Sequence, residues 1–93
     1  MIGQFVLVRC YSAGVHCGIL VSRNGQEVEL KDARRIWRWR GANTLNELSQ
    51  NGASAEYTRI SEMVPVIFLN ETCEIIPCST KASENLAQSH WAK

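Results

Sequence analysis

This sequence lacks the motifs on which most catalytic and metal sites are built. It has only two histidines, His16 and His90, and it contains no Gly-x-Ser-x-Gly, His-Glu-x-x-His, P-loop or dinucleotide-binding glycine pattern. Its four cysteines form no Cys-x-x-Cys pair, so the usual ligand spacing of a zinc site is missing. We therefore expect neither an enzyme nor a bound metal or cofactor, and we interpret the cysteines as reduced core residues.

Long apolar runs are missing as well. No stretch approaches the roughly 20 residues that a membrane-spanning helix needs. The first residues carry no basic leader, and Arg9 comes too early for an apolar signal core, so we expect no secretion signal. A chain of 93 residues with 45% hydrophobic and 20% charged residues predicts one globular domain over 1–93. We expect it in the cytoplasm, away from membranes.

One segment, residues 34–40, is far richer in charge and aromatic rings than the rest of the chain. It reads Arg-Arg-Ile-Trp-Arg-Trp-Arg and holds four of the ten Lys and Arg residues and two of the three tryptophans. Its charge is +4 and the formal net charge of the chain is +1, so the remaining residues sum to −3. Such a local patch favours a small anionic ligand or a defined partner over general nucleic-acid binding.

Alternating apolar residues and turn signals predict antiparallel strands in the first forty residues. The Asn24-Gly25 pair is the strongest short hairpin signal, and Asp32-Ala33 predicts a break. Two further strands are expected to pair with each other as a second hairpin. The polar, aperiodic residues 53–62 predict a loop. The six expected strands cover residues 5–10, 15–23, 26–30, 34–40, 64–69 and 73–76.

Two helices are predicted, one in the middle of the chain and one at its end. Thr44 and Glu47 form a capping box for a short helix over 44–51, and Gly52 is placed to end it. Ser79 or Thr80 can cap a last helix that runs to about residue 89. The predicted fold class is α+β, an antiparallel sheet of about six strands (meander plus hairpin) with one short middle helix and one C-terminal helix. Exposed sheet edges and three tryptophans further predict a homo-oligomer.

Regular alternation divides the segment 34–40 into two faces. One face would carry Arg35, Trp37 and Trp39, and the other Arg34, Ile36, Arg38 and Arg40. Two neighbouring indoles can form a stacking platform for a base, and guanidinium groups bind phosphate. In the alternative, Trp37 packs inward and Trp39 lies at a subunit interface, while Glu27 and Glu29 of the preceding strand neutralise the arginines across the sheet.

A second candidate is the turn from Tyr11 to His16. Backbone donors in its Ser-Ala-Gly sequence can bind an anion, and Tyr11 or His16 can flank a ring. The alternative is a tight strand connection with a half-buried tyrosine. The candidate ligand-binding residues are therefore Arg34, Arg35, Trp37, Arg38, Trp39, Arg40, Tyr11 and His16.

Four segments together resemble a family of small, functionally unassigned proteins of tailed bacteriophages and prophages. These are Tyr-Ser-Ala-Gly-Val-His-Cys-Gly (11–18), Lys-Asp-Ala-Arg-Arg-Ile-Trp-Arg-Trp (31–39), Gly-Ala-Asn-Thr-Leu-Asn-Glu-Leu-Ser (41–49) and Glu-Ile-Ile-Pro-Cys (74–78). The Ala-Arg-Arg-x-Trp-x-Trp element, with the helix that follows it, is the most specific part. The resemblance implies a phage origin and the cytoplasm of a bacterial host, but it implies no chemistry.

These features lead to one hypothesis with an alternative. The hypothesis is a non-enzymatic phage accessory protein that binds and sequesters a nucleotide-like anionic ligand, such as a host immune signal. The alternative is a structural or protein-interaction module of phage that uses the Arg/Trp strand as an interface with another subunit or a host protein. Neither requires a membrane, and the small net charge argues against a nucleic-acid partner.

Overall fold

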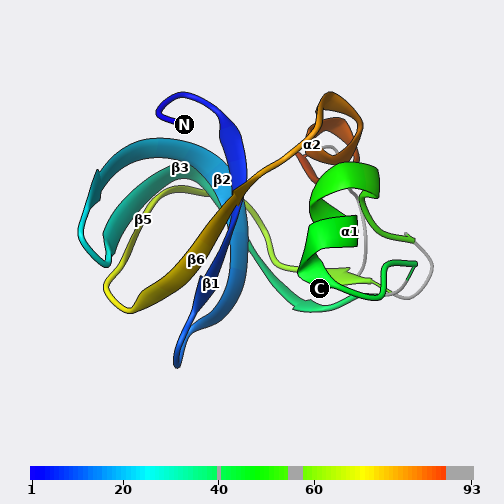
Figure 1. The fold of residues 1–93 in the computed structure, drawn as a ribbon, viewed down its shortest axis with the longest axis horizontal. Coiled ribbons are helices and arrows are strands. Elements are labelled where there is room, and N and C mark those ends of the chain that lie inside the picture. The colour runs from blue at the N-terminus through cyan, green and yellow to red at the C-terminus, as the bar shows by residue number, and fades with distance from the viewer. Residues whose placement is uncertain (40, 55–57, 88–93) are drawn as a thin grey trace.

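A computed structural model describes residues 1–39, 41–54 and 58–87, which hold six strands and two helices. The α+β class predicted from the sequence is confirmed: one antiparallel six-stranded sheet is accompanied by a short middle helix and a C-terminal helix (Figure 1). In chain order the elements are β1 (Phe5–Cys10), β2 (Gly14–Asn24), β3 (Glu27–Arg38), α1 (Leu45–Asn51), β4 (Arg59–Ile60), β5 (Val64–Leu69), β6 (Thr72–Pro77) and α2 (Thr80–Ala87).

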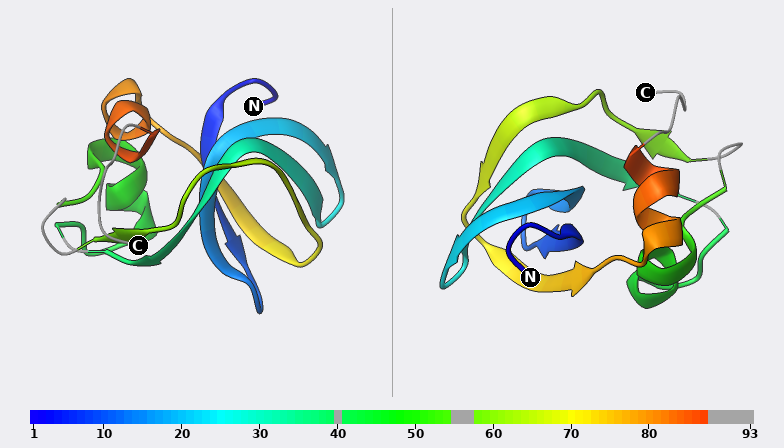
Figure 2. Two further views of the ribbon diagram at one scale, coloured as in Figure 1. Left: turned by 180° about the vertical axis from the view of Figure 1, so that it is seen from behind. Right: turned by 90° about the horizontal axis from the view of Figure 1, so that it is seen from above.

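The sheet curls until its two edges meet. The strands follow the order β5-β3-β2-β1-β6, and β4 pairs with the end of β3. Although β5 and β6 lie on opposite edges, only Asn70 and Glu71 separate them in sequence. Because an extended chain covers about 3.3–3.6 Å per residue, this short link brings the two edges together at one end (Figure 2). The N–H of Thr72 also donates to the carbonyl of Gln26, 3.2 Å away in the β2–β3 turn.

The last two strands do not form the hairpin expected from the sequence. Each pairs with a different neighbour, so that Phe68 of β5 lies opposite Glu29 of β3 and Ile75 of β6 lies opposite Val8 of β1. A turn signal shows only that the chain reverses direction. The partner of each strand is decided by the apolar side chains that it buries against the rest of the sheet.

The concave side of the sheet encloses a first apolar cluster, here called the inner cluster. Strands from both edges contribute to it, since Leu69 of β5 is a buried member and Ile75 of β6 packs against it. The alternation expected from the sequence is confirmed for β3, in which Val28 and Leu30 are buried here. The buried members are Val6, Val8, Cys10, Leu20, Val28, Leu30, Ala33 and Leu69.

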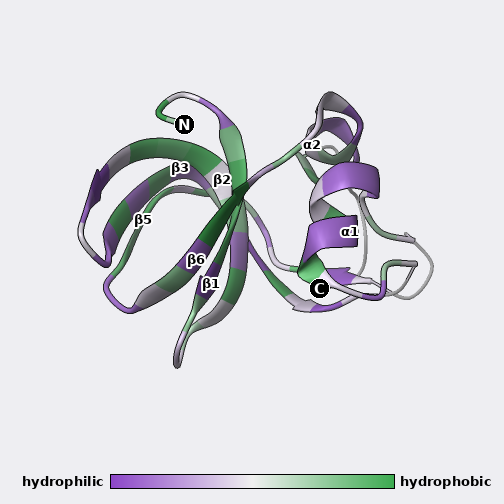
Figure 3. Cartoon of the chain, viewed as in Figure 1, coloured by the Kyte–Doolittle hydropathy of each residue, from purple (hydrophilic) through white to green (hydrophobic). Residues whose placement is uncertain are grey.

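A second cluster, here called the helix cluster, lies between the opposite side of the sheet and the two helices. Leu7 of β1 joins it, so strand β1, which lies between β2 and β6, is buried on both faces. Figure 3 shows apolar stretches along β2 and β6 and polar stretches on the visible side of α1. The buried members of the helix cluster are Leu7, Val15, Cys17, Ile36, Leu48, Ala53, Ile60 and Leu86.

The helix ends follow the capping signals. The hydroxyl of Thr44 accepts from the N–H of Glu47 at 3.1 Å, and Gly52, with φ of 77°, donates its N–H to Leu48 at 2.9 Å. Ser79 caps α2, because its hydroxyl accepts from the N–H of Ala82 at 3.0 Å. In the described part of the chain, no helix has the length and apolar character needed to cross a membrane.

Candidate functional site

The Arg/Trp segment is the second half of a long strand and not a strand of its own. β3 runs without interruption from Glu27 to Arg38, and the break expected at Asp32 is a bulge in which this residue has φ of 50°. The register with β2 shifts at the same place. A short polar side chain tolerates the left-handed conformation better than most, so the bulge falls on a suitable residue.

Because β3 is continuous, the glutamates expected to neutralise the arginines lie on the same strand as the arginines. Glu27 and Glu29 were expected on a neighbouring strand, opposite the arginines. They lie instead near the start of the same strand, where Glu29 faces Ser22 on one side and Phe68 on the other. Cross-strand neutralisation of the arginines by these two glutamates was therefore a wrong prediction.

The predicted pairing of Trp37 and Trp39 on one face is also wrong. The register with β4 shifts between Ile36 and Arg38, and the strand ends immediately afterwards. Trp39 consequently packs against the helix cluster, to which Ile36 belongs, while Trp37 is 55% exposed. The two indoles therefore form no shared stacking platform. The alternative in which Trp37 packs inward is wrong as well, because Trp39 is the indole that packs inward. Arg40, another predicted ligand contact, lies outside the described residues.

Arg34 has an internal role, which differs from the ligand contact expected from the sequence. Its side chain is only 8% exposed. The Nε–H group donates to the carbonyl of Ser61 at 2.9 Å, and Nη1 donates to the carbonyl of Leu86 at 3.0 Å. The second acceptor lies in the last turn of α2, where carbonyl groups lack helical donors. Arg34 therefore connects β3 to the C-terminal helix.

His16 is buried as well. It faces the same side of the sheet as its cross-strand partner Val8, and its Nε2 atom lies 3.0 Å from the carbonyl of Ala13. Burial lowers the pKa of His16, and the nearby charge of Arg35 lowers it further. The ring is therefore neutral near pH 7, with Nε2–H as the donor, and it is not accessible to a ligand. Nδ1 has no hydrogen-bond partner among the described residues.

Tyr11 lies in the β1–β2 turn with 83% of its surface exposed. Its backbone N–H donates to the carbonyl of Glu71 at 3.0 Å, which ties this turn to the β5–β6 link. The half-buried tyrosine of the alternative interpretation is therefore not observed. Tyr11 lines neither of the two pockets described below.

We call a group of four residues the Arg/Trp surface: the exposed Arg35, Trp37 and Arg38 of β3 and the half-buried Arg59 of β4. Arg38 and Arg59 are cross-strand partners, which places two like charges side by side. Within the described residues, none of these arginines has a carboxylate within 4 Å. Like charges in direct cross-strand positions repel, and an anionic group placed over them relieves that repulsion.

A pocket of about 230 Å³ adjoins this surface beside Arg35. It lies between the second half of β3 and the segment that leads into β5, where the N–H of Arg35 donates to the hydroxyl of Ser61 at 2.8 Å. Typical ligand pockets measure about 300–1,000 Å³, so this one suits a phosphate or carboxylate group better than a whole nucleotide. It is lined by Ala33, Arg34, Arg35, Ser61, Glu62, Val64 and Ile67.

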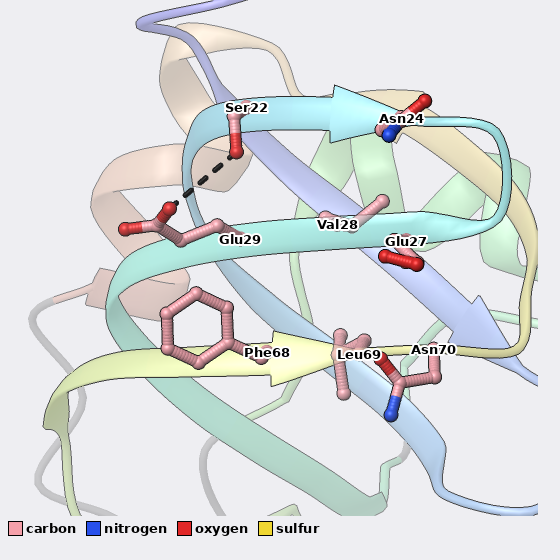
Figure 4. Close-up of a pocket in the computed structure, with 8 residues that line it drawn as sticks. All are labelled: Ser22, Asn24, Glu27, Val28, Glu29, Phe68, Leu69 and Asn70. Carbon is pink, nitrogen blue, oxygen red and sulfur yellow. Dashed lines mark hydrogen bonds between the residues drawn. The ribbon is translucent and has the colours of Figure 1, made fainter.

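A second pocket of about 210 Å³ lies over β2, β3 and β5 (Figure 4). Two carboxylates line it and no basic residue does. The hydroxyl of Ser22 donates to Glu29 at 3.4 Å, next to the ring of Phe68 (Figure 4). The lining residues are Ser22, Asn24, Glu27, Val28, Glu29, Phe68, Leu69 and Asn70.

The cysteines follow the sequence prediction in part. Cys10 and Cys17 are buried and Cys78 is half-buried, but Cys73 is exposed; all four are free thiols. Burial raises the pKa of Cys17 and of Cys78 to about 12. Over the described residues, no three His, Cys, Asp or Glu side chains come together as a metal site would require.

Sequence reasoning missed two contributors to this region, Arg59 and Ser61. Both fall in the stretch 53–62 that was predicted to be a loop, whereas the structure places β4 there and buries Thr58 and Ile60. A lone apolar residue between two polar ones, as in Arg59-Ile60-Ser61, was the available signal for a short edge strand.

Comparisons with known proteins give a family without a known activity. A family model described as a domain of unknown function (DUF6948) matches residues 3–86. No curated protein and no solved structure matches the chain.

Proposed function

We propose that this chain, which belongs to the DUF6948 family, is a non-enzymatic interaction module whose Arg/Trp surface binds an acidic face of a partner protein. One observation carries the proposal: Trp37 is 55% exposed between the exposed side chains of Arg35 and Arg38, which have no carboxylate partner among the described residues. Trp and Arg are the residues most enriched among the energetic centres of protein interfaces.

The two kinds of side chain would contribute differently. Burying an indole at the centre of an interface accounts for about 2–4 kcal/mol of binding free energy. An exposed Arg–carboxylate pair accounts for about 0.2–1 kcal/mol, and its main effect is on the association rate and on salt dependence. Trp37 would therefore set the affinity, while Arg35, Arg38 and Arg59 would select an acidic partner.

The resemblance to phage proteins narrows the kind of partner that this proposal requires. The partner would be a protein of the bacterial cytoplasm or another phage subunit, and binding would need no cofactor. The partner's contact face would be acidic and would present an apolar pocket for one indole ring.

A titration of variants tests the proposal. The chain is immobilised, exposed to a bacterial lysate, and the partner that binds in stoichiometric amount is purified and titrated in solution. We expect Trp37→Ala to weaken binding about 30-fold or more and Arg38→Ala to weaken it several-fold, with the second effect vanishing at high salt. Arg23→Ala, at an exposed arginine of β2, is the matched control. Equal effects of the Arg38 and Arg23 substitutions, or unchanged affinity in Trp37→Ala, would contradict the proposal.

Sequestration of a nucleotide-like ligand is the second candidate function. The pocket beside Arg35 favours it, because the side chain of an exposed arginine lines a space that fits a phosphate group. It ranks second because Arg34 is engaged internally and the two tryptophans form no common platform.

Mass spectrometry of compounds released from the purified protein, followed by calorimetry against cyclic and linear nucleotides, tests this second function. Micromolar binding that is lost in Arg35→Ala supports it. Absence of any bound nucleotide, together with identical behaviour of Arg35→Ala and the unmodified chain, excludes it.

A further inference from the structure

The convex face of the sheet carries two rows of three side chains on β2, β3 and β5, which we call the grid. Cross-strand pairing puts Ile19, Lys31 and Val66 in one row. The next row, two residues further along β3, holds Ser22, Glu29 and Phe68 (Figure 4). On β3, Leu30 lies between the rows and points to the inner cluster, so Lys31 and Glu29 belong to the opposite, outward face with their cross-strand partners. A bulge in β2 puts two residues between Ile19 and Ser22, and the hydroxyl of Ser22 still reaches Glu29.

The part of the grid on β5 is apolar and exposed. Phe68 is 68% exposed and Val66 is 45% exposed. On the neighbouring strand Lys31 is exposed and Glu29 is half-buried, and within the described residues neither has an ion-pair partner. Large exposed apolar side chains next to unpaired charges are typical of a surface that another molecule covers.

The order of the residues makes this grid complementary to itself. Consider a twofold axis that lies in the contact plane and runs across the strands, midway between the two rows. It sets each row of one copy against the other row of the second copy, so that Val66 meets Phe68, Lys31 meets Glu29 and Ile19 meets Ser22. On β5 apolar groups then face apolar groups, and on β3 each positive charge faces a negative one.

We propose that this convex face binds a second copy of the chain and forms a twofold-symmetric dimer by face-to-face packing of the two sheets. The ammonium group of Lys31 would enter the second copy's acidic pocket beside Glu29 and Phe68, which no basic residue of its own copy lines. Pro65 lacks a backbone N–H, so it disfavours the competing arrangement in which β5 pairs edge to edge. The face is separate from the Arg/Trp surface and leaves that surface accessible.

Sedimentation equilibrium of the full chain, from about 5 µM to about 1 mM, measures the dimer. Symmetry doubles every contact, so one charge reversal creates two like-charged pairs. We expect Glu29→Lys and Lys31→Glu each to weaken the dimer about tenfold or more. The double variant, which exchanges the two charges, should return to within about threefold of the unmodified chain. Val66→Asp should leave a monomer, because it places a carboxylate opposite Phe68.

Two matched controls and a test of folding complete the experiment. Glu84→Lys makes the same charge change as Glu29→Lys on the exposed side of α2, and Tyr11→Ala removes a ring outside the grid that is more exposed than Phe68. Far-UV circular dichroism confirms that each variant is folded. A monomer throughout the concentration range overturns the proposal. The proposal is also overturned if Glu29→Lys weakens the dimer no more than Glu84→Lys does. It is overturned as well if the double variant does not restore dimerisation.

Discussion

Removal of the Arg34 side chain should destabilise the fold, although the sequence presents this residue as one of several equivalent arginines. The substitution Arg34→Ala takes away two hydrogen bonds, at 2.9 Å to Ser61 and at 3.0 Å to Leu86, from a side chain that is 8% exposed. A hydrogen bond to a charged donor contributes about 1.5–3 kcal/mol net. Removing the buried charge recovers part of its desolvation cost. We therefore expect a loss of about 2–4 kcal/mol in the free energy of unfolding, a large part of the 5–15 kcal/mol typical of a domain.

Urea denaturation followed by circular dichroism measures this loss, with Arg38→Ala as the matched control. Arg38 is exposed and has no ion pair within the described residues, so its replacement should change stability by less than about 0.5 kcal/mol. The stability of Arg34→Lys should lie between those of Arg34→Ala and Arg38→Ala, because one ammonium group replaces a guanidinium group that donates to two carbonyl groups. Equal stability of Arg34→Ala and Arg38→Ala would refute the assignment of Arg34 as a connection between β3 and α2.

Two further predictions concern buried titratable groups. Because burial lowers the pKa of His16, the unfolded chain takes up a proton more readily than the folded chain. The free energy of unfolding should therefore fall as the pH drops below about 6.5, with a slope of up to about 1.4 kcal/mol per pH unit. His16→Asn should flatten that part of a stability–pH curve, and an unchanged slope would contradict the assignment. Titration of thiols in the folded protein should show one rapidly reacting cysteine, the exposed Cys73. Cys10 is buried, and a pKa of about 12 leaves Cys17 and Cys78 almost without the reactive thiolate form. Rapid reaction of all four would contradict the burial.

Local sequence signals predicted most elements of the fold. The strands Phe5–Cys10 and Val64–Leu69 have the expected positions, and the first hairpin turn lies one residue later than expected, at Gly25-Gln26. The cap residues Thr44 and Gly52 act as predicted. These features depend on neighbours within a few residues, which is why composition and spacing suffice to locate them.

The pairing of strands and the orientation of the Arg/Trp segment depend on longer-range contacts. Bulges at Asp32 and after Ile36 shift the alternation of β3, and neither residue type marks a bulge reliably. The burial of Arg34 requires a carbonyl of α2, more than fifty residues away. No pattern within residues 34–40 can therefore distinguish Arg34, which connects β3 to α2, from the arginines that stay exposed.

The double burial of β1 has a consequence for how the chain unfolds. Val6 and Val8 belong to the inner cluster, and Leu7 between them belongs to the helix cluster. A domain of this size buries too little surface for either cluster to persist alone. One strand supplies side chains to both clusters. Unfolding of the helices therefore exposes the apolar side chains of β1 that they cover, and opening of the sheet removes the surface against which the helices pack. The two cores should therefore unfold as one cooperative unit, with the slowest amide exchange along β1.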